Sequence, residues 1–157
     1  MTTSNNTPSS SSGSPLDASD FPRIWDTITG GATPDHGQVL AEAMNTTILR
    51  DAILAETART QTWDTLEHAA VVAARAANTH RTPVAGPMTL HALARVIAGD
   101  TPSAIVLLDI VLAENPDYTL ALLTVRAILG HLPGPVLAAI FADISLTECL
   151  HTAPTTN

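Results

Sequence analysis

The segment AGDTPSAIVLLDIVLAENPDY, residues 98–118, combines a helix start signal, a helix stop signal and almost no polar side. Thr101 is predicted as the N-cap with Pro102 in the first turn, where a missing N–H costs no hydrogen bond, and Asn115-Pro116 ends the helix. A helix that is apolar on nearly every side must be buried on more than one face in a water-soluble protein. The segment therefore requires neighbouring helices, or a partner, to cover it.

Short breaks rich in proline and glycine divide the rest of the chain into further helical segments. Apolar residues recur at three- and four-residue spacing, typical of a helix buried on one face, in residues 35–59, 63–77, 90–97 and 119–130. The first of these has a break near Thr46-Thr47, and shorter helices are predicted at Val136 to Ala142 and after the capping-box pattern Ser145-x-x-Glu148. Because loops of two to five residues place neighbouring helices antiparallel, we expect an all-α fold of antiparallel helical hairpins.

The chain is predicted to hold one helical domain, residues 34–151, preceded by two shorter segments. Residues 1–20 are mainly Ser, Thr, Asn, Pro and Gly with little to bury, which predicts a disordered tail. Residues 21–31 place Phe21, Ile24 and Trp25 at near-helical spacing, which predicts a short helix or hook that docks on the domain. An aromatic content of 3% and abundant alanine favour closely packed helices over a β-sandwich.

The charge distribution argues against binding to nucleic acid or to a membrane surface. The formal net charge is −8, and the 7 basic residues, all arginine, are scattered among 15 acids, whereas phosphate binding needs clustered cations. No run of 18 uncharged apolar residues and no secretory leader is present, so no membrane span is expected. With Cys149 as the single cysteine, these features predict a cytoplasmic protein.

No residue pattern that carries catalysis or metal binding is recognisable, so we expect no enzyme activity, no catalytic residue, no metal and no cofactor. A nucleophile elbow such as G-x-S-x-G is absent, and Gly30-Gly31 lacks a phosphate-binding pattern. None of the six histidines pairs with a second His, Cys or acid at a recognised ligand spacing: His36, His68, His80, His91, His131 and His151.

Three charged residues interrupt otherwise apolar helical stretches. Arg50 and Asp51 are interpreted as a structural charge network, because a buried charge is rarely left unpaired, with contact to a charged ligand as the alternative. Asp109 interrupts the apolar segment of residues 105–112. It either marks the one edge of that helix exposed to water or pairs with Arg95 or Arg126.

Part of the chain resembles the second half of a tetratricopeptide repeat. The positions that match are Ala92, Gly99, Ala104 and Pro116. Leu108 and Val111 replace the aromatic residue and the alanine that the repeat uses. The resemblance implies a helical array whose concave groove is lined by Thr89, Leu93, Val96 and Leu123. A groove so apolar rarely stays bare, so we expect a partner helix, a second copy of the chain or the hook to cover it.

A second resemblance covers roughly residues 45 to 135. It rests on RDAIL at 50–54, W-x-x-L at 63–66, PV at 83–84, AGD at 98–100, NPDY at 115–118 and LP at 132–133. These stretches resemble the C-terminal portion of an uncharacterised actinobacterial family, domain-of-unknown-function family 4192. Members of this family usually carry a longer N-terminal portion, so the resemblance implies that the polar leader stands in its place here. The resemblance implies architecture and supplies no mechanism.

These observations favour a small helical-repeat-like module that works by protein–protein contact, with a protein partner or with itself. Two other interpretations stay open. The chain is either a truncated family member that has lost an enzymatic or ligand-binding N-terminal portion, or an acidic regulator of a DNA-binding partner that does not itself contact DNA.

Overall fold

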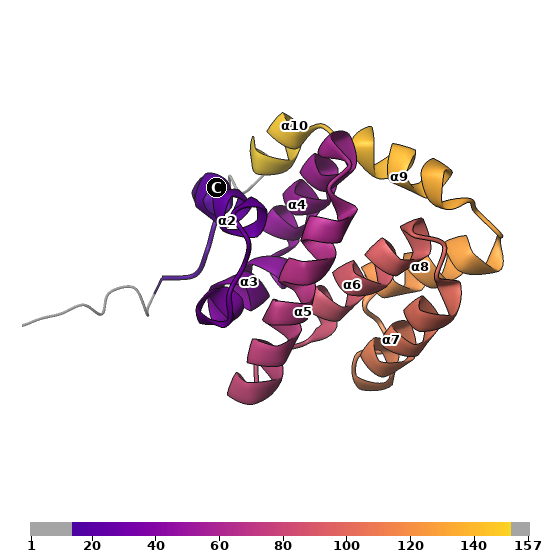
Figure 1. Cartoon of the computed structure of the whole chain (residues 1–157), viewed down its shortest axis with the longest axis horizontal. Coiled ribbons are helices and arrows are strands. Elements are labelled where there is room, and N and C mark those ends of the chain that lie inside the picture. The colour runs from indigo at the N-terminus through magenta and orange to yellow at the C-terminus, as the bar shows by residue number, and fades with distance from the viewer. Residues whose placement is uncertain (1–13, 152–157) are drawn as a thin grey trace, which may run out of the picture.

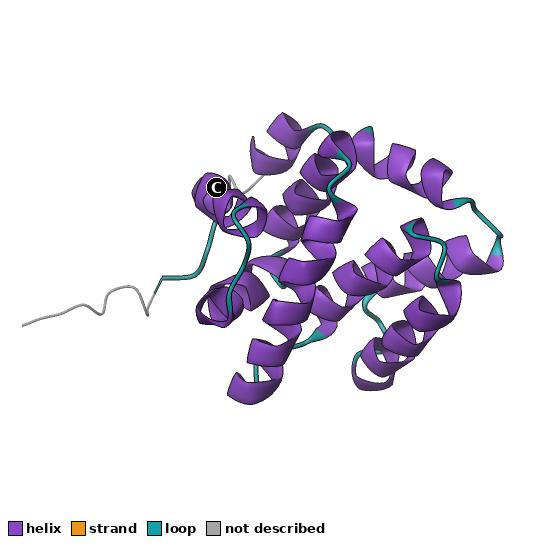
Figure 2. Ribbon diagram, viewed as in Figure 1, coloured by secondary structure: helices purple, strands orange, loops and turns teal. Residues whose placement is uncertain are grey.

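The computed structural model describes residues 14–151, which fold into packed helices joined by short loops, with no strand in that range (Figure 2). This confirms the predicted all-α class. In chain order the elements are η1 (Ala18–Asp20), α2 (Phe21–Thr29), η2 (Pro34–His36), α3 (Gly37–Met44), α4 (Thr47–Thr60), α5 (Trp63–His80), α6 (Ala85–Ile97), α7 (Thr101–Glu114), α8 (Thr119–Leu129), α9 (Gly134–Ala142) and α10 (Leu146–His151).

Helix α2 lies within residues 21–31, where the sequence predicts a docking hook. Its side chains Phe21, Ile24 and Ile28 are buried against the body. Residues 18–20, which the sequence assigned to the disordered tail, instead form the η1 turn. Residues 1–13 of that predicted tail lie outside the described residues.

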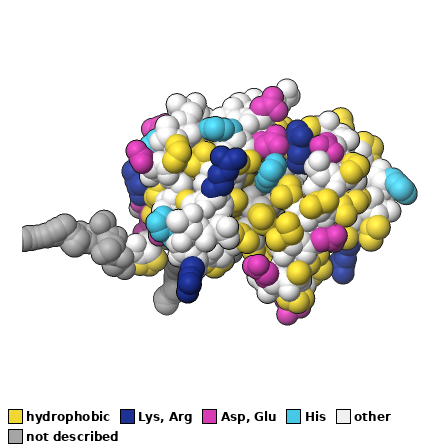
Figure 3. Space-filling model, turned by 60° about the horizontal axis from the view of Figure 1, so that its bottom comes forward, with side chains coloured by type: hydrophobic (Ala, Val, Ile, Leu, Met, Phe, Trp, Pro, Cys, Tyr) yellow, Lys and Arg dark blue, Asp and Glu magenta, His cyan; other side chains and the backbone are white. Residues whose placement is uncertain are grey.

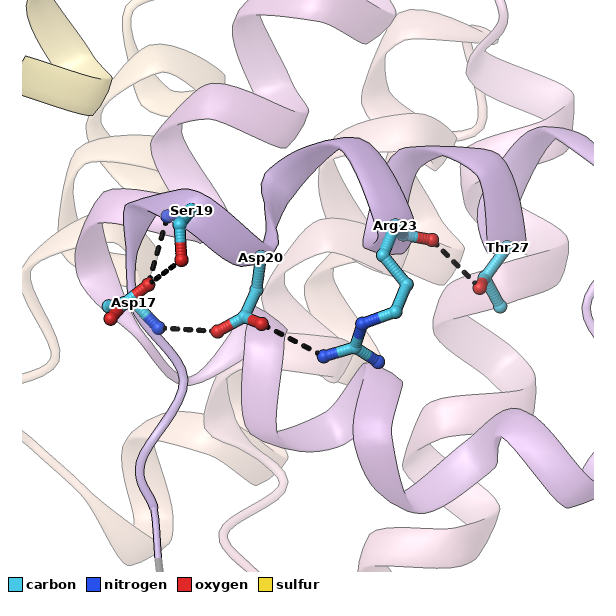
Figure 4. Close-up of polar contacts among 5 residues, drawn as sticks. All are labelled: Asp17, Ser19, Asp20, Arg23 and Thr27. Carbon is cyan, nitrogen blue, oxygen red and sulfur yellow. Dashed lines mark hydrogen bonds and ion pairs between the residues drawn. The ribbon is translucent and has the colours of Figure 1, made fainter. Parts of the chain in front are cut away.

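A capping box fixes the chain just before α2 (Figure 4). The Asp17 carboxylate accepts a hydrogen bond from the Ser19 backbone N–H at 2.9 Å, and the Asp20 carboxylate accepts one from the Asp17 backbone N–H at 2.8 Å. Asp20 also pairs with Arg23 at 3.0 Å, and the Thr27 hydroxyl donates to the Arg23 carbonyl. Reciprocal side-chain bonds of this kind satisfy N–H groups that a helix start leaves without a partner.

Helix α5 lies at the centre of the helical body, between α3 and α6, and α6 in turn packs against α7 (Figure 1). Small residues allow these close approaches. A Cβ atom on Gly86 of α6 would lie 2.1 Å from the Met44 carbonyl oxygen, and one on Gly37 would lie 2.5 Å from the Ala76 Cβ. The alanine-rich face of α5 serves the same purpose, with Ala69, Ala70, Ala73 and Ala77 buried.

Helix α4 departs from a regular array of hairpins. It packs little against α5, which follows it in the chain, and is covered instead by α9 and α10, which return across the molecule from α8 (Figure 1). Gln61, in the left-handed backbone region with φ of 57°, ends α4 and redirects the chain. A regular tetratricopeptide array therefore stays a prediction for this fold.

Two local predictions can be compared with the structure in detail. The break predicted near Thr46-Thr47 is present, because α3 ends at Met44 and α4 begins at Thr47. The predicted N-cap of α7 is wrong by one residue. Asp100 is the cap, since its carboxylate accepts the Ser103 backbone N–H at 3.2 Å, and Thr101 is already helical.

Candidate interaction face

Helix α7 is anchored on one side and exposed on the others. Its buried residues Ala104, Leu108 and Val111 recur at helical spacing and pack towards α6. The Asp100 cap, which pairs with Arg95 at 3.2 Å, fixes its first turn. Three large apolar side chains on its other sides face water: Ile105, Val106 and Ile110.

Helix α8 is tied to the body through Tyr118, the residue just before its first turn. Arg50 of α4 donates a hydrogen bond to the Tyr118 hydroxyl at 3.1 Å, and its guanidinium lies 5.7 Å from the centre of the Tyr118 ring. Leu120, Ala121 and Thr124 face inward from α8. The other sides of the helix again expose large apolar side chains, at Leu122, Leu123 and Leu129.

An apolar groove of about 420 Å³ separates α8 from α9. Thr124, a polar residue of its lining, donates its hydroxyl to the Leu120 carbonyl at 2.8 Å, so the hydroxyl is already bonded within α8. Arg126 lies at the rim. The remaining lining is Leu120, Leu123, Ala127, Gly130, Leu132, Leu137, Ile140 and Phe141.

We use the term apolar surface for the large hydrophobic side chains that α7, α8 and α9 leave exposed: Ile105, Val106, Ile110, Leu122, Leu123, Leu129, Val136 and Ile140. Leu129 is 72% exposed and Leu123 is 51% exposed. No other large hydrophobic residue in the described part of the chain is comparably exposed. In Figure 3, hydrophobic side chains gather over the half of the molecule that holds α7 and α8, with acidic side chains and arginines at several points among them.

The structure separates the four residues that the sequence placed in an interaction groove. Thr89, Leu93 and Val96 are buried in α6, which α5 and α7 cover on two sides, so they cannot touch a partner while these helices stay packed. Leu123 is on the surface, at the edge of the α8–α9 groove. The open concave groove implied by the repeat resemblance is therefore filled at these three positions.

Of the three residues in the predicted charge network, two pair with each other and the third does not. Arg50 and Asp51 form an ion pair at 2.8 Å. Burial alone lowers the pKa of Arg50, but the hydrogen bond to Tyr118 and the nearby Asp51 carboxylate outweigh it and raise the pKa, so Arg50 keeps its charge. Asp109 is exposed and makes no ion pair within the described residues, whereas Arg95 pairs with Glu67 at 3.0 Å.

The titratable groups that could do chemistry are dispersed. No group of three His, Cys, Asp or Glu side chains within residues 14–151 is arranged to hold a metal ion. His91 lies 3.0 Å from Glu67, and His68 lies 2.8 Å from the Ala32 carbonyl oxygen, contacts that join neighbouring elements. Burial raises the pKa of the Cys149 thiol, with the Asp51 and Glu148 carboxylates adding to the effect, which disfavours the nucleophilic thiolate.

Most of the apolar surface was not expected from the repeat resemblance, although the sequence carries a signal for it. Residues 134–142 contain no charged side chain, and residues 101–114 contain Asp109 and Glu114 alone. Uniformly apolar helices near the end of a small domain have too few neighbours to bury every side. None of the helices in the described part of the chain is both long and apolar enough to span a membrane.

Comparisons with known proteins place the chain in a family without identifying an activity. No curated protein and no solved structure matches it. A family model does match, over residues 10–134, a longer stretch than the one that carries the resemblance in the sequence. The match ends where α9 begins, so most of α9 and all of α10 lie beyond it. The chain belongs to the family described as domain of unknown function DUF4192.

Proposed function

We propose that this protein is an interaction module that binds a protein partner through the apolar surface of α7, α8 and α9. One observation carries the proposal: the eight most exposed large hydrophobic side chains among residues 14–151 all lie on these three helices. Apolar surface removed from water contributes about 25 cal/mol per Å². Extended apolar patches are rare on soluble monomers and mark places where a partner binds.

The chemistry of the α8–α9 groove favours a protein partner over a small molecule that reacts in the groove. Its walls are aliphatic and aromatic, and Thr124 uses its hydroxyl within α8. No carboxylate, imidazole or thiol lies in the lining, so the groove offers no general acid or base. An open groove with apolar walls can accommodate the apolar side chains of another polypeptide.

Site-specific photo-crosslinking in the native host tests the proposal. A photo-reactive phenylalanine analogue replaces Leu129 in one variant and Arg75, an exposed residue of α5, in a matched control. We expect light-dependent protein adducts from position 129 and none of the same mass from position 75. If neither position, or both equally, gives adducts, the apolar surface is not a binding face and the proposal fails.

A further inference from the structure

The outer sides of α7 and α8 each carry one charged residue among apolar neighbours. Asp109 has Ile105 and Val106 one turn before it, and Arg126 lies between Leu122 and Leu129. Both charged residues are exposed, and neither side chain makes an ion pair or hydrogen bond within the described residues. Glu114, at the end of α7, is the other charged residue of the two helices.

Helical geometry places Asp109 and Arg126 on the same outer face of the α7–α8 pair. Each projects from the side of its helix opposite the buried stripe, which comprises Ala104, Leu108 and Val111 in α7 and Leu120, Ala121 and Thr124 in α8. A four-residue loop joins the helices, so they run in opposite directions. Counted from that loop, the two residues lie about 8 Å and 11 Å along their helices, at nearly the same level.

This arrangement is self-complementary. A two-fold axis parallel to the helices places α7 of one copy against α8 of the other. Residues of the two copies that lie at the same height along this axis then face each other. Asp109 then faces Arg126 of the partner subunit, and the apolar residues around each charge pack against their counterparts. We propose, building on the proposed function, that a second copy of this chain covers the α7–α8 face in a two-fold dimer.

Charge and composition favour a second copy over the chain's own ends. Residues 1–13 and 152–157 consist almost entirely of Ser, Thr, Asn, Pro and other small or polar residues, which suit no apolar face. Asp109 and Arg126 carry opposite charges that cancel on this face, whereas the chain as a whole has a net charge of −8. Two copies of the acidic chain that meet through these residues therefore bring opposite charges together at the contact.

Charge-reversal variants test the dimer, and sedimentation velocity of the full chain at micromolar concentrations is the measurement. In a dimer of Asp109→Arg, two arginines face each other in each of the two symmetry-related contacts. In a dimer of Arg126→Asp, two acids face each other there. We expect each variant to associate at least about tenfold more weakly than the wild type. An equimolar mixture of the two variants restores every opposite-charge pair, so it is expected to form heterodimers of wild-type strength.

Arg75→Asp on α5 changes the net charge by the same amount as Arg126→Asp and is expected to leave the dimer intact. Circular dichroism of every variant checks that the helices are kept. Any one of three results would overturn the dimer: the wild type stays monomeric, the single charge reversals leave association unchanged, or the mixture of the two variants stays monomeric. A monomeric wild type whose position 129 crosslinks to a different protein would overturn the dimer and leave the proposed function standing.

Discussion

Helices α2–α6 and helices α7–α9 are both rich in apolar residues, yet only the second group leaves large apolar side chains exposed. Of the largest fully buried side chains, the body α2–α6 supplies Ile24, Ile28, Leu40, Met44, Leu49, Ile53, Leu54, Leu66, Leu90 and Leu93, and α7 supplies Leu108 and Val111. In the part of the chain that the structure describes, the exposed large hydrophobic side chains all belong to α7–α9. Hydrophobic content alone therefore does not locate the core of this protein; the number of neighbouring helices does.

The cause of the difference is position in the packing order. Helix α5 has α3 on one side and α6 on the other, whereas within residues 14–151 no further helix packs over the outer sides of α7 and α8 (Figure 1). A last helix pair in a stacked array ordinarily turns a polar outer face to water. Here that face is Ile105, Val106, Leu122 and Leu129 around two charges. The α7–α8 pair therefore has the composition of an internal layer, although it lies at the outside of the packed helices.

The largest effect that separates the two regions is expected from one truncation in each. Leu93→Ala in α6 removes a side chain that is 0% exposed and leaves a cavity, which is expected to lower the free energy of unfolding by about 3 kcal/mol. Leu129→Ala in α8 truncates a side chain that is 72% exposed, with an expected change within about 0.5 kcal/mol. Urea unfolding of both variants at low protein concentration provides the measurement. Equal losses would show that Leu93 is no more buried in solution than Leu129.

Two glycines give a second contrast, between crowding in the body and backbone conformation next to α7. Gly86→Ala places a Cβ against the Met44 carbonyl and the Asn45 side chain, and is expected to cost about 2 kcal/mol. Gly99→Ala meets no atom within 4 Å but must hold a φ of 89°, so about 1 kcal/mol is expected. Thermal unfolding of both variants measures the difference. A milder effect at Gly86 than at Gly99 would contradict the close contact between α3 and α6.

A third change weakens the link between the two regions. Tyr118→Phe removes the hydroxyl that accepts a hydrogen bond from Arg50, whose side chain is 14% exposed, and is expected to lower the free energy of unfolding by about 1 kcal/mol. The matched control repeats the change in an Arg50→Met background, where the bond is already absent. The same substitution should then cost little. An undiminished cost in that background would show that Tyr118 acts through its ring alone.

The positions of most helices were accessible from the sequence because their signals are local. Helix α6 is an exception, since it begins at Ala85, five residues before the predicted segment 90–97, with Pro87 tolerated in its first turn. The break near Thr46-Thr47, the glycine before α7 and Asn115-Pro116 after it all act on their own backbone, and the helices end near these residues. The N-cap of α7 was misplaced because Asp100 and Thr101 are both favourable caps, and hydrogen-bond geometry alone distinguishes them.

The packing partners of the helices were not accessible in the same way. Nothing local indicates that α9 and α10 return to cover α4, since those contacts join residues far apart in the chain. The same limitation explains Thr89, Leu93 and Val96. A repeat register assigns them to an open groove, but the sides of α6 are occupied by neighbouring helices, so all three are buried. For α7, uniform hydrophobicity indicated a missing cover without indicating which sides lack one.

The smallest expected effect concerns the start of α7 and depends on pH. Hydrogen bonds from the Ser103 side chain and backbone, with the Arg95 charge adding to them, lower the pKa of the Asp100 carboxyl below its usual range. A carboxyl whose pKa is lower in the folded state stabilises the fold fully above its unfolded pKa of about 4, and this contribution is lost as the pH falls through the folded value.

Asp100→Asn keeps an acceptor at the cap but removes the charge. Its melting temperature should therefore fall slightly below that of the wild type at about pH 6, and the difference should vanish towards about pH 2. Asp117→Asn, in the loop after α7, changes the same charge without a cap hydrogen bond and controls for net charge. A difference at Asp100 that persists or grows in acid would mean that the cap does not depend on the ionised carboxylate.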